Sequence, residues 1–303
     1  MLTIKKILIA GFLILILIWG LILFLAFSDH SYQLFVPKFI KTTSLNLGDK
    51  SSGVDLSQTG PWKQDLFMAT GNGSSFDGKS FLAHGVATPS AIVRNNEVLV
   101  YFNYFPQNTR KGFSTIHLIK STTNGRQWTQ PLQVVINQSA GFTTVPASPK
   151  AIVTTNGKIK LYFLAKKPGD DRTKMFAAVS DDGQNFVFDP KTQFEIENES
   201  LISIAVNILD DRLHLMAYTQ EGSLRSTAYH AISYDTNVFT RLADVTIKDS
   251  YYGQNTLLND GNSLKLIGNS LKGLWSSTSK DGNTWSNPSY LSFNAQNPGI
   301  TKL

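Results

Sequence analysis

SKDGNTW, at residues 279–285, is the stretch that decides the fold, because its pattern occurs at four earlier places in the chain. Each copy has a Ser or Thr near its start, then Asp-Gly, Asn-Gly or a degenerate form of that pair, and an aromatic residue at its end. The other copies read SFDGKSF at 75–81, TTNGRQW at 122–128, SDDGQNF at 180–186 and SYDTNVF at 233–239. Their first positions lie 47, 58, 53 and 46 residues apart, which is the length of one four-stranded propeller blade.

The chemistry of this pattern is that of a tight turn between two strands. An Asp or Asn side chain accepts hydrogen bonds from the turn's own amides, and Gly takes the positive φ that a Cβ disfavours. The aromatic residue is then expected to fill the space between neighbouring sheets. One copy is weak support for a fold, but five copies at blade spacing predict a repeated hairpin.

Short apolar strands follow each copy in a regular order. We expect strand pairs at 89–93 with 98–102, 149–153 with 159–163, 202–209 with 213–217, and 255–258 with 264–267. Third strands are expected at 114–120, 174–179, 226–232 and 273–278. The first strand of each set is expected to be the innermost one.

The two ends of this region complete each other. The tail NPGITKL at 297–303 is similar to TPSAIVR at 88–94, so it is expected to be an innermost strand, but no further strands of a blade follow it. Residues 66–70 and the first motif copy supply the outer strands of a blade that lacks an innermost strand. Residues 43–47 are a candidate for the missing second strand. The sequence therefore predicts an all-β, five-bladed β-propeller over residues 61–303, closed by N- and C-terminal strands in one blade.

An apolar segment precedes the propeller. Residues 7–27 are apolar apart from one Trp and two glycines, and about 20 such residues suffice for a helix to cross a bilayer core of ~30 Å. Lys5 and Lys6 place the N-terminus in the cytoplasm by the positive-inside rule. We expect a transmembrane anchor at 1–28, a polar stalk at 29–60, and a propeller that faces the periplasm or the extracellular space. The alternative, a cleaved signal peptide, normally has a shorter apolar region.

Composition removes several classes of function. The chain has no cysteine, which excludes disulfides, thiolate catalysis and Cys-ligated zinc. The formal charge of +6 is spread over scattered Lys and Arg residues, which excludes the basic stripe of a nucleic-acid-binding protein. The five histidines show no metal-binding spacing, so no metal site or cofactor is predicted, although a channel calcium held by carbonyls and waters would leave little trace.

With these motifs the chain resembles the Asp-box, sialidase-like propellers, whose turns read Ser-x-Asp-x-Gly-x-Thr-Trp, although here the motif is one residue shorter. In layout it is more similar to the five-bladed glycosidases of the arabinanase, xylosidase and fructosidase type. The resemblance covers roughly residues 62–303 and implies a glycosidase-like propeller that binds or hydrolyses a glycan. In these families the motif itself is structural.

The resemblance also implies where acids should lie, and the sequence departs from it there. Arabinanase-like enzymes often have an Asp-Pro step at the start of innermost strands, and the matching steps here are Thr88-Pro89 and Ser148-Pro149. No arginine trio of the sialidase kind is recognisable. The alternative function is therefore a non-catalytic module that binds a glycan or a protein partner, and a receptor layout with one helix and one propeller stays open as well.

Other carboxylates at the same end of the ring are candidates for chemistry, because glycoside hydrolysis needs two of them across a sugar. Glu199 precedes the third blade's innermost strand and Asp249 precedes the fourth's, where Tyr252 could act as a nucleophile by analogy with sialidases. The predicted substrate-binding residues lie at or beside innermost-strand starts: His84, Thr88, Ser148, Lys150, Tyr251 and Gln254. The alternative is that the acids are solvated loop residues and that His84 is a hydrogen-bonded surface histidine.

Overall fold

The computed structural model describes residues 64–71, 76–105, 115–137, 141–219, 226–247, 255–270, 273–291 and 299. The chain divides into two units, Met1–Asn46 and Leu47–Leu303, and every described residue belongs to the second. The expected anchor at 1–28 and the stalk at 29–60 lie outside the described residues. Within the described ranges no helix is long and apolar enough to cross a bilayer.

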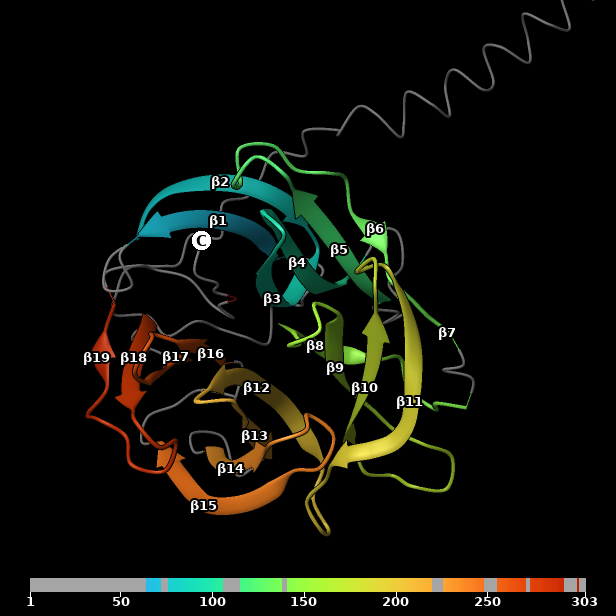
Figure 1. The fold of residues 1–303 in the computed structure, drawn as a ribbon, viewed down its shortest axis with the longest axis vertical. Helices are drawn as coiled ribbons and strands as arrows, with labels where there is room; N and C mark the ends of the chain where they lie inside the picture. The colour runs from blue at the N-terminus through green and yellow to red at the C-terminus, as the bar shows by residue number, and fades with distance from the viewer. Residues whose placement is uncertain are drawn as a thin grey trace, which may run out of the picture. The chain divides into compact units, whose positions relative to one another are not determined.

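Nineteen strands make up the described part of the second unit (Figure 1). They are β1 (Asp65–Gly71), β2 (Phe76–His84), β3 (Val86–Arg94), β4 (Glu97–Tyr104), β5 (Thr115–Ser121), β6 (Leu132–Gln133), β7 (Val135–Asn137), β8 (Ala147–Val153), β9 (Ile159–Ala165), β10 (Lys174–Ser180), β11 (Asn185–Phe194), β12 (Leu201–Leu209), β13 (Arg212–Thr219), β14 (Ser226–Ser233), β15 (Thr240–Ile247), β16 (Thr256–Asn259), β17 (Leu264–Ser270), β18 (Gly273–Ser279) and β19 (Ser289–Tyr290).

These strands form antiparallel sheets arranged around a ring. The sheets run β3-β4-β5-β6, β8-β9-β10-β11, β12-β13-β14-β15 and β16-β17-β18-β19, and β1 pairs with β2 in a two-stranded sheet. Figure 1 shows the first strand of each four-stranded set nearest the centre, and β3 contacts β8, β8 contacts β12, and β12 contacts β16. The fold is an all-β propeller, and the expected inner, second and third strands of these four sheets are confirmed.

The core consists of separate apolar layers between neighbouring sheets, because each sheet is covered on both faces. One layer joins the sheets of β3 and β8 and includes Tyr101, Phe163 and Phe186, all fully buried. Another joins the sheets of β8 and β12 around Tyr162 and Ile204. Second strands such as β9 are therefore buried along their whole length and do not alternate between buried and exposed residues.

The recurring motif forms the turn between the third and fourth strands, as expected. In the third copy, Asp182 Oδ1 accepts hydrogen bonds from the amides of Gln184 and Asn185, both at 2.8 Å, and Ser180 Oγ accepts one from the amide of Gly183 at 2.8 Å. The fifth copy repeats these contacts around Asp281, and Trp285 Nε1 donates to the Gly282 carbonyl at 2.8 Å. Gly183 and Gly282 both have φ of +79°.

Two copies differ from the expectation. In the second copy the hydroxyl that accepts from the Gly125 amide belongs to Ser121, at 2.9 Å, so this turn begins one residue before the quoted motif. The first copy is no turn between strands, because Phe76–His84 is a single strand, β2, and Gly78 with φ of +67° lies at a register shift within it. Phe81 packs edge-on against Phe67 and is half exposed, so it does not fill a space between sheets.

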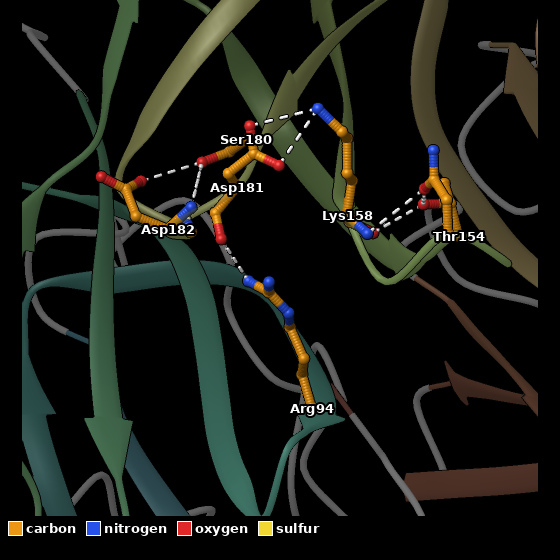
Figure 2. Close-up of polar contacts among 8 residues, drawn as sticks. Arg94, Thr154, Lys158, Ser180, Asp181 and Asp182 are labelled. Atoms are coloured by element: carbon orange, nitrogen blue, oxygen red, sulfur yellow. Dashed lines mark hydrogen bonds and ion pairs between the residues drawn. The ribbon is translucent and has the colours of Figure 1, made fainter.

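The turn of the third copy also ties neighbouring strands together (Figure 2). Arg94, at the end of β3, donates to the Asp181 carbonyl at 2.7 Å, and Lys158 Nζ lies 3.1 Å from the Asp181 carboxylate. A short strand, β7, adds in parallel to the outer edge of β11 and protects that edge. No pattern in the sequence predicts this pairing.

Candidate functional site

The innermost strands all begin at one end of the ring, and we call this end the rim: the residues at and just before the starts of β3, β8, β12 and β16. The recurring turns lie at the other end of the sheets. The strand pairings show register shifts at three of these starts, between Ala87 and Ser90, between Ala147 and Lys150, and between Leu201 and Ser203. Such bulges re-aim side chains and are common next to binding and catalytic sites.

Thr88 and Ser148 occupy equivalent places at the rim and share an unusual backbone. Each precedes a proline, and each has a φ of +52°. One side chain on β4 holds both: Asn103 Oδ1 accepts from Thr88 Oγ1 and from the Ser148 amide, each at 2.8 Å, and Asn103 Nδ2 donates to the Pro146 carbonyl at 3.2 Å. A positive φ is rare for a β-branched residue, so the surrounding structure imposes it.

Lys150 lies two residues beyond Ser148 and points across to the neighbouring sheet. Its Nζ donates to the Pro89 carbonyl at 3.4 Å, and only 5% of the residue is exposed. Burial lowers the pKa of the Lys150 ammonium to about 8, which still leaves most of it charged at neutral pH. In the same crossing, the Ala151 amide donates to Ser90 Oγ at 3.0 Å.

Glu199, the predicted acid before β12, is half-buried and held by a tyrosine. Tyr229 donates its hydroxyl proton to Glu199 Oε1 at 2.8 Å. Burial raises the pKa of the Tyr229 hydroxyl, and this hydrogen bond to Glu199 raises it further. The Arg241 guanidinium lies 4.3 Å from the centre of the Tyr229 ring and pairs with Asp244 at 2.8 Å. Tyr229 therefore fixes the position of the Glu199 carboxylate.

His84, a predicted substrate-binding residue, ends β2 just before β3. Its Nδ1 is hydrogen-bonded to the carboxylate of Asp65, the first residue of β1. An imidazole that is oriented by a carboxylate can act as an acid or a base. The sequence did not signal Asp65, because the pairing of β1 with β2 brings the two together over 19 positions.

A cluster of ion pairs lies between β9, β10 and β11 at the same end. Arg172 donates to both carboxylate oxygens of Asp170 at 3.1 Å, and Lys174 Nζ bonds Asp170 at 2.7 Å and also contacts Glu195. Hydrogen bonds from Arg172 and Lys174 hold the pKa of Asp170 well below its usual range. These charges neutralise one another, so the cluster favours structure over chemistry.

Sequence reasoning missed two asparagines that shape the rim. Asn103 lies inside the apolar strand β4, and a polar amide among buried apolar residues was the feature of the sequence that could have identified it. Asn255 precedes β16, is fully buried, and lies beside the buried hydroxyl of Tyr218, whose pKa burial raises.

The predicted residues Asp249, Tyr251, Tyr252 and Gln254 lie outside the described residues, so the pairing of Glu199 with Asp249 remains a prediction. Of the described side chains, no three from His, Asp or Glu gather as a metal site. What the described rim offers is neutral hydrogen-bonding groups, one buried ammonium, and two acids, Asp65 and Glu199, that are each held by a partner.

No protein-family model matches this sequence, and no functionally curated protein matches it. Solved structures match its shape. The chain has a β-propeller fold, similar to that of solved glycoside hydrolases. A family 117 glycoside hydrolase from Zobellia galactanivorans aligns over 73% of this chain and 74% of its own, with a TM-score of 0.52 and 15% identity.

Two further structures agree with that result. A thermostable family 43 glycoside hydrolase aligns over 66% of this chain and 70% of its own, with a TM-score of 0.54 and 12% identity. The family 32 β-fructofuranosidase of Bombyx mori aligns over 64% of this chain, with a TM-score of 0.51 and 13% identity, and this chain spans 45% of that enzyme. Identities this low establish the fold alone.

Proposed function

We propose that this protein binds a glycan at the rim of its propeller. The observation that carries the proposal is the conformation of Thr88 and Ser148, two equivalent rim residues held at a φ of +52° by one asparagine. Backbone strain of this kind costs of order 1–3 kcal/mol per residue and is retained mainly where function needs the geometry. The hydroxyl and amide groups gathered there suit the hydroxyls of a sugar, and the similar folds are those of glycoside hydrolases.

The test of glycan binding is a screen of the full-length protein in detergent against immobilised oligosaccharides, followed by calorimetry on the glycans that bind. Asn103→Leu should weaken binding by at least about tenfold, because it releases both rim residues. The matched control is Asn207→Leu, since Asn207 also bridges neighbouring sheets, donating to the Leu257 carbonyl at 2.8 Å, but lies toward the opposite end of β12. Equal losses in the two variants would remove the rim from the proposal.

Hydrolysis is the second candidate function, and the fixed contact between Tyr229 and Glu199 favours it. In this version Glu199 acts with Asp249, and Tyr252 serves as a nucleophile of the sialidase kind. A panel of aryl glycosides, including sialosides, arabinofuranosides and xylosides, tests it. Turnover that Glu199→Gln and Asp249→Asn both abolish would support an enzyme. Binding without turnover supports the non-catalytic module, as does the absence of a carboxylate at positions 88 and 148.

We also propose that the propeller has five blades and is closed by its two ends. The two-stranded sheet of β1 and β2 would form the outer part of the fifth blade, and the tail at 297–303 its innermost strand. Support comes from Gly299, which lies so close to β3 that a Cβ there would sit 2.7 Å from the Pro89 carbonyl oxygen. Gly299→Val should therefore lower the unfolding midpoint markedly; an unchanged midpoint would argue against closure by the tail.

The last part of the proposal is that residues 7–27 anchor the protein in a membrane, with the N-terminus cytoplasmic and the propeller outside. It rests on the length of the apolar segment and on Lys5 and Lys6. Fractionation with alkaline washing, followed by protease treatment of spheroplasts, in which a periplasmic or extracellular propeller is open to the protease, tests it. Release of the protein by alkali, or protection of the propeller from the protease, would contradict it.

A further inference from the structure

Two buried lysines on neighbouring strands invite comparison. Lys150 on β8 is 5% exposed and Lys160 on β9 is 3% exposed. Burial lowers the pKa of each ammonium to about 8. A buried charge is costly unless hydrogen bonds or an opposite charge compensate it, so the partners of each lysine show what its place in the fold requires.

Lys160 is fully compensated by the protein. Its Nζ donates to Asn237 Oδ1 at 2.6 Å, to the Thr236 carbonyl at 2.7 Å and to Gln193 Oε1 at 3.4 Å. Its three N–H donors thus have three acceptors, and the charges of Asp189 and Asp235 favour its protonated form. Lys160 is a structural lysine that fastens β9 to the turn of the fourth motif copy.

Lys150 lacks such compensation. Its contact with a described residue is one long hydrogen bond, 3.4 Å, to the Pro89 carbonyl, and none of the ion pairs among the described residues includes it. An ammonium has three N–H donors and no acceptor, so two donors are available for another group. The favoured partner of a poorly compensated buried cation is an oxyanion.

The location of Lys150 ties this property to the rim. Lys150 ends the bulge that contains Ser148, and its ammonium bonds the carbonyl of Pro89, the residue that follows Thr88, so it connects the two strained rim segments. The polar groups that join the same two sheets are neutral: Ser90 accepts from the Ala151 amide and Asn103 from the Ser148 amide, and both side chains are buried. A sugar bound by these groups would bring a substituent to the ammonium.

We propose that Lys150 recognises an acidic sugar, so that the rim takes a glycan whose residues carry a carboxylate or a sulfate group. This inference rests on the proposed function, because it names the chemical class of glycan that the same site binds. It assigns Lys150 as the specificity-determining residue and Lys160 as its structural counterpart. No covalent step is involved.

The test is calorimetry on the full-length protein with matched ligands. Digalacturonic acid carries carboxylates where galactobiose carries hydroxymethyl groups. Galactobiose 6-sulfate supplies the second kind of oxyanion, a sulfate. We expect one of the two acidic ligands to bind at least about tenfold more tightly than galactobiose, and the tighter one identifies the oxyanion. Lys150→Met should remove that preference, so that the acidic ligand binds no more tightly than galactobiose. Lys160→Met, although destabilising, should retain the preference.

A second measurement on the unaltered protein guards against misfolding of the variant. Between pH 6.5 and 9.5 the affinity for the acidic ligand should fall by at least about tenfold as the Lys150 ammonium loses its proton, while that for galactobiose stays constant. Equal binding of acidic and neutral ligands, with no effect of Lys150→Met, would overturn the inference and leave the proposed function intact. Absence of binding to any glycan would overturn both.

Discussion

Asp182 and Ser148 lie at opposite ends of the same sheet, one in the turn after β10 and the other at the start of β8. Asp182 accepts four hydrogen bonds from its own turn, and these lower its pKa far below the usual range. Ser148 instead has its backbone held at a positive φ, beside a poorly compensated ammonium. The turn around Asp182 satisfies its polar groups and stabilises the fold, whereas the rim at Ser148 combines strain with unused donors, as a binding site does.

The largest expected effect tests how tightly the turn end is packed. Gly282→Ala places a Cβ 2.4 Å from the buried ring of His230 and at a φ of +79°. We expect the free energy of unfolding to fall by at least about 3 kcal/mol, because neither the ring nor the backbone can move freely. Urea denaturation measures this change.

The matched control for that variant is Gly261→Ala. Gly261 has a φ of +91° but no atom within 4 Å of a built Cβ, so only the backbone cost of about 1 kcal/mol should appear. Similar losses at the two glycines would show that backbone strain, and not packing, dominates at the turn end.

The second prediction concerns pH at the same contact. His214 and His230 are stacked, with His214 Nδ1 3.0 Å from His230 Nε2 and His230 Nδ1 2.7 Å from Asn283 Oδ1. Asn283 Oδ1 accepts from the Nδ1–H of His230, and in a neutral His230 ring Nε2 then accepts from the Nδ1–H of His214. In a neutral His214 ring, Nε2 is consequently an acceptor, and it is buried without a partner. Burial and the neighbouring His230 and Arg212 lower the pKa of His214 to about 4, and burial lowers that of His230.

Since these folded pKa values lie below the ordinary value of ~6.5, the unfolded chain binds more protons in that interval. The contribution of the two neutral histidines to the free energy of unfolding should be fully present above about pH 6.5. It should decrease by about 2 kcal/mol as pH falls toward 4, after allowance for solvent screening. Denaturation midpoints across this range measure the slope. His214→Asn should flatten the curve; a curve parallel to that of the unaltered protein would assign the slope to other groups.

The sequence predicted the turn end better than the rim, because the contacts of the turns join residues that are close together in the chain. The turns were predictable because Ser180, Asp182 and Gly183 interact within a few residues of one another. The inner, second and third strands followed from their apolar runs and from the spacing of those turns. The rim was predicted only as positions: Thr88, Ser148 and Lys150 were named, but not what holds them.

The missing part of the rim depends on contacts between residues far apart in the chain. Asn103 reaches Ser148 over 45 positions and Lys150 reaches Pro89 over 61, and no local pattern encodes either contact. The failure at the first motif copy has a related cause. Its residues match the turn pattern, yet pairing with β1 draws them into one strand, so tertiary contacts override the local preference.

The third prediction isolates a single turn carboxylate. Asp182→Ala leaves the amides of Gln184 and Asn185 without their acceptor, and we expect a loss of about 1–2 kcal/mol, as for a missing helix cap. Asp181→Ala, in the same turn, removes only the exposed ion pair with Lys158 and should cost less than about 1 kcal/mol. Thermal unfolding of both variants decides whether the turn carboxylate, or charge in general, stabilises this end.

The smallest expected effect has the opposite sign and belongs to the rim. Ser148→Gly keeps the amide that donates to Asn103 and relieves the positive φ, a gain of about 1–2 kcal/mol that the greater freedom of Gly in the unfolded chain partly offsets. We expect a net gain of about 0.5 kcal/mol in unfolding free energy, together with weaker glycan binding. Ser203→Gly, in the bulge of β12, relieves no positive φ and should lose about 0.5–1 kcal/mol.

The pair of serine variants decides whether the rim is strained for a reason. A gain at position 148 with reduced binding would mean that stability is given up there for a fixed binding geometry, the usual trade at functional sites. A loss at both positions would mean that Ser148 is as well accommodated as Ser203. The left-handed backbone would then be an ordinary feature of the bulge, and the two ends of the sheet would differ in their contacts but not in their strain.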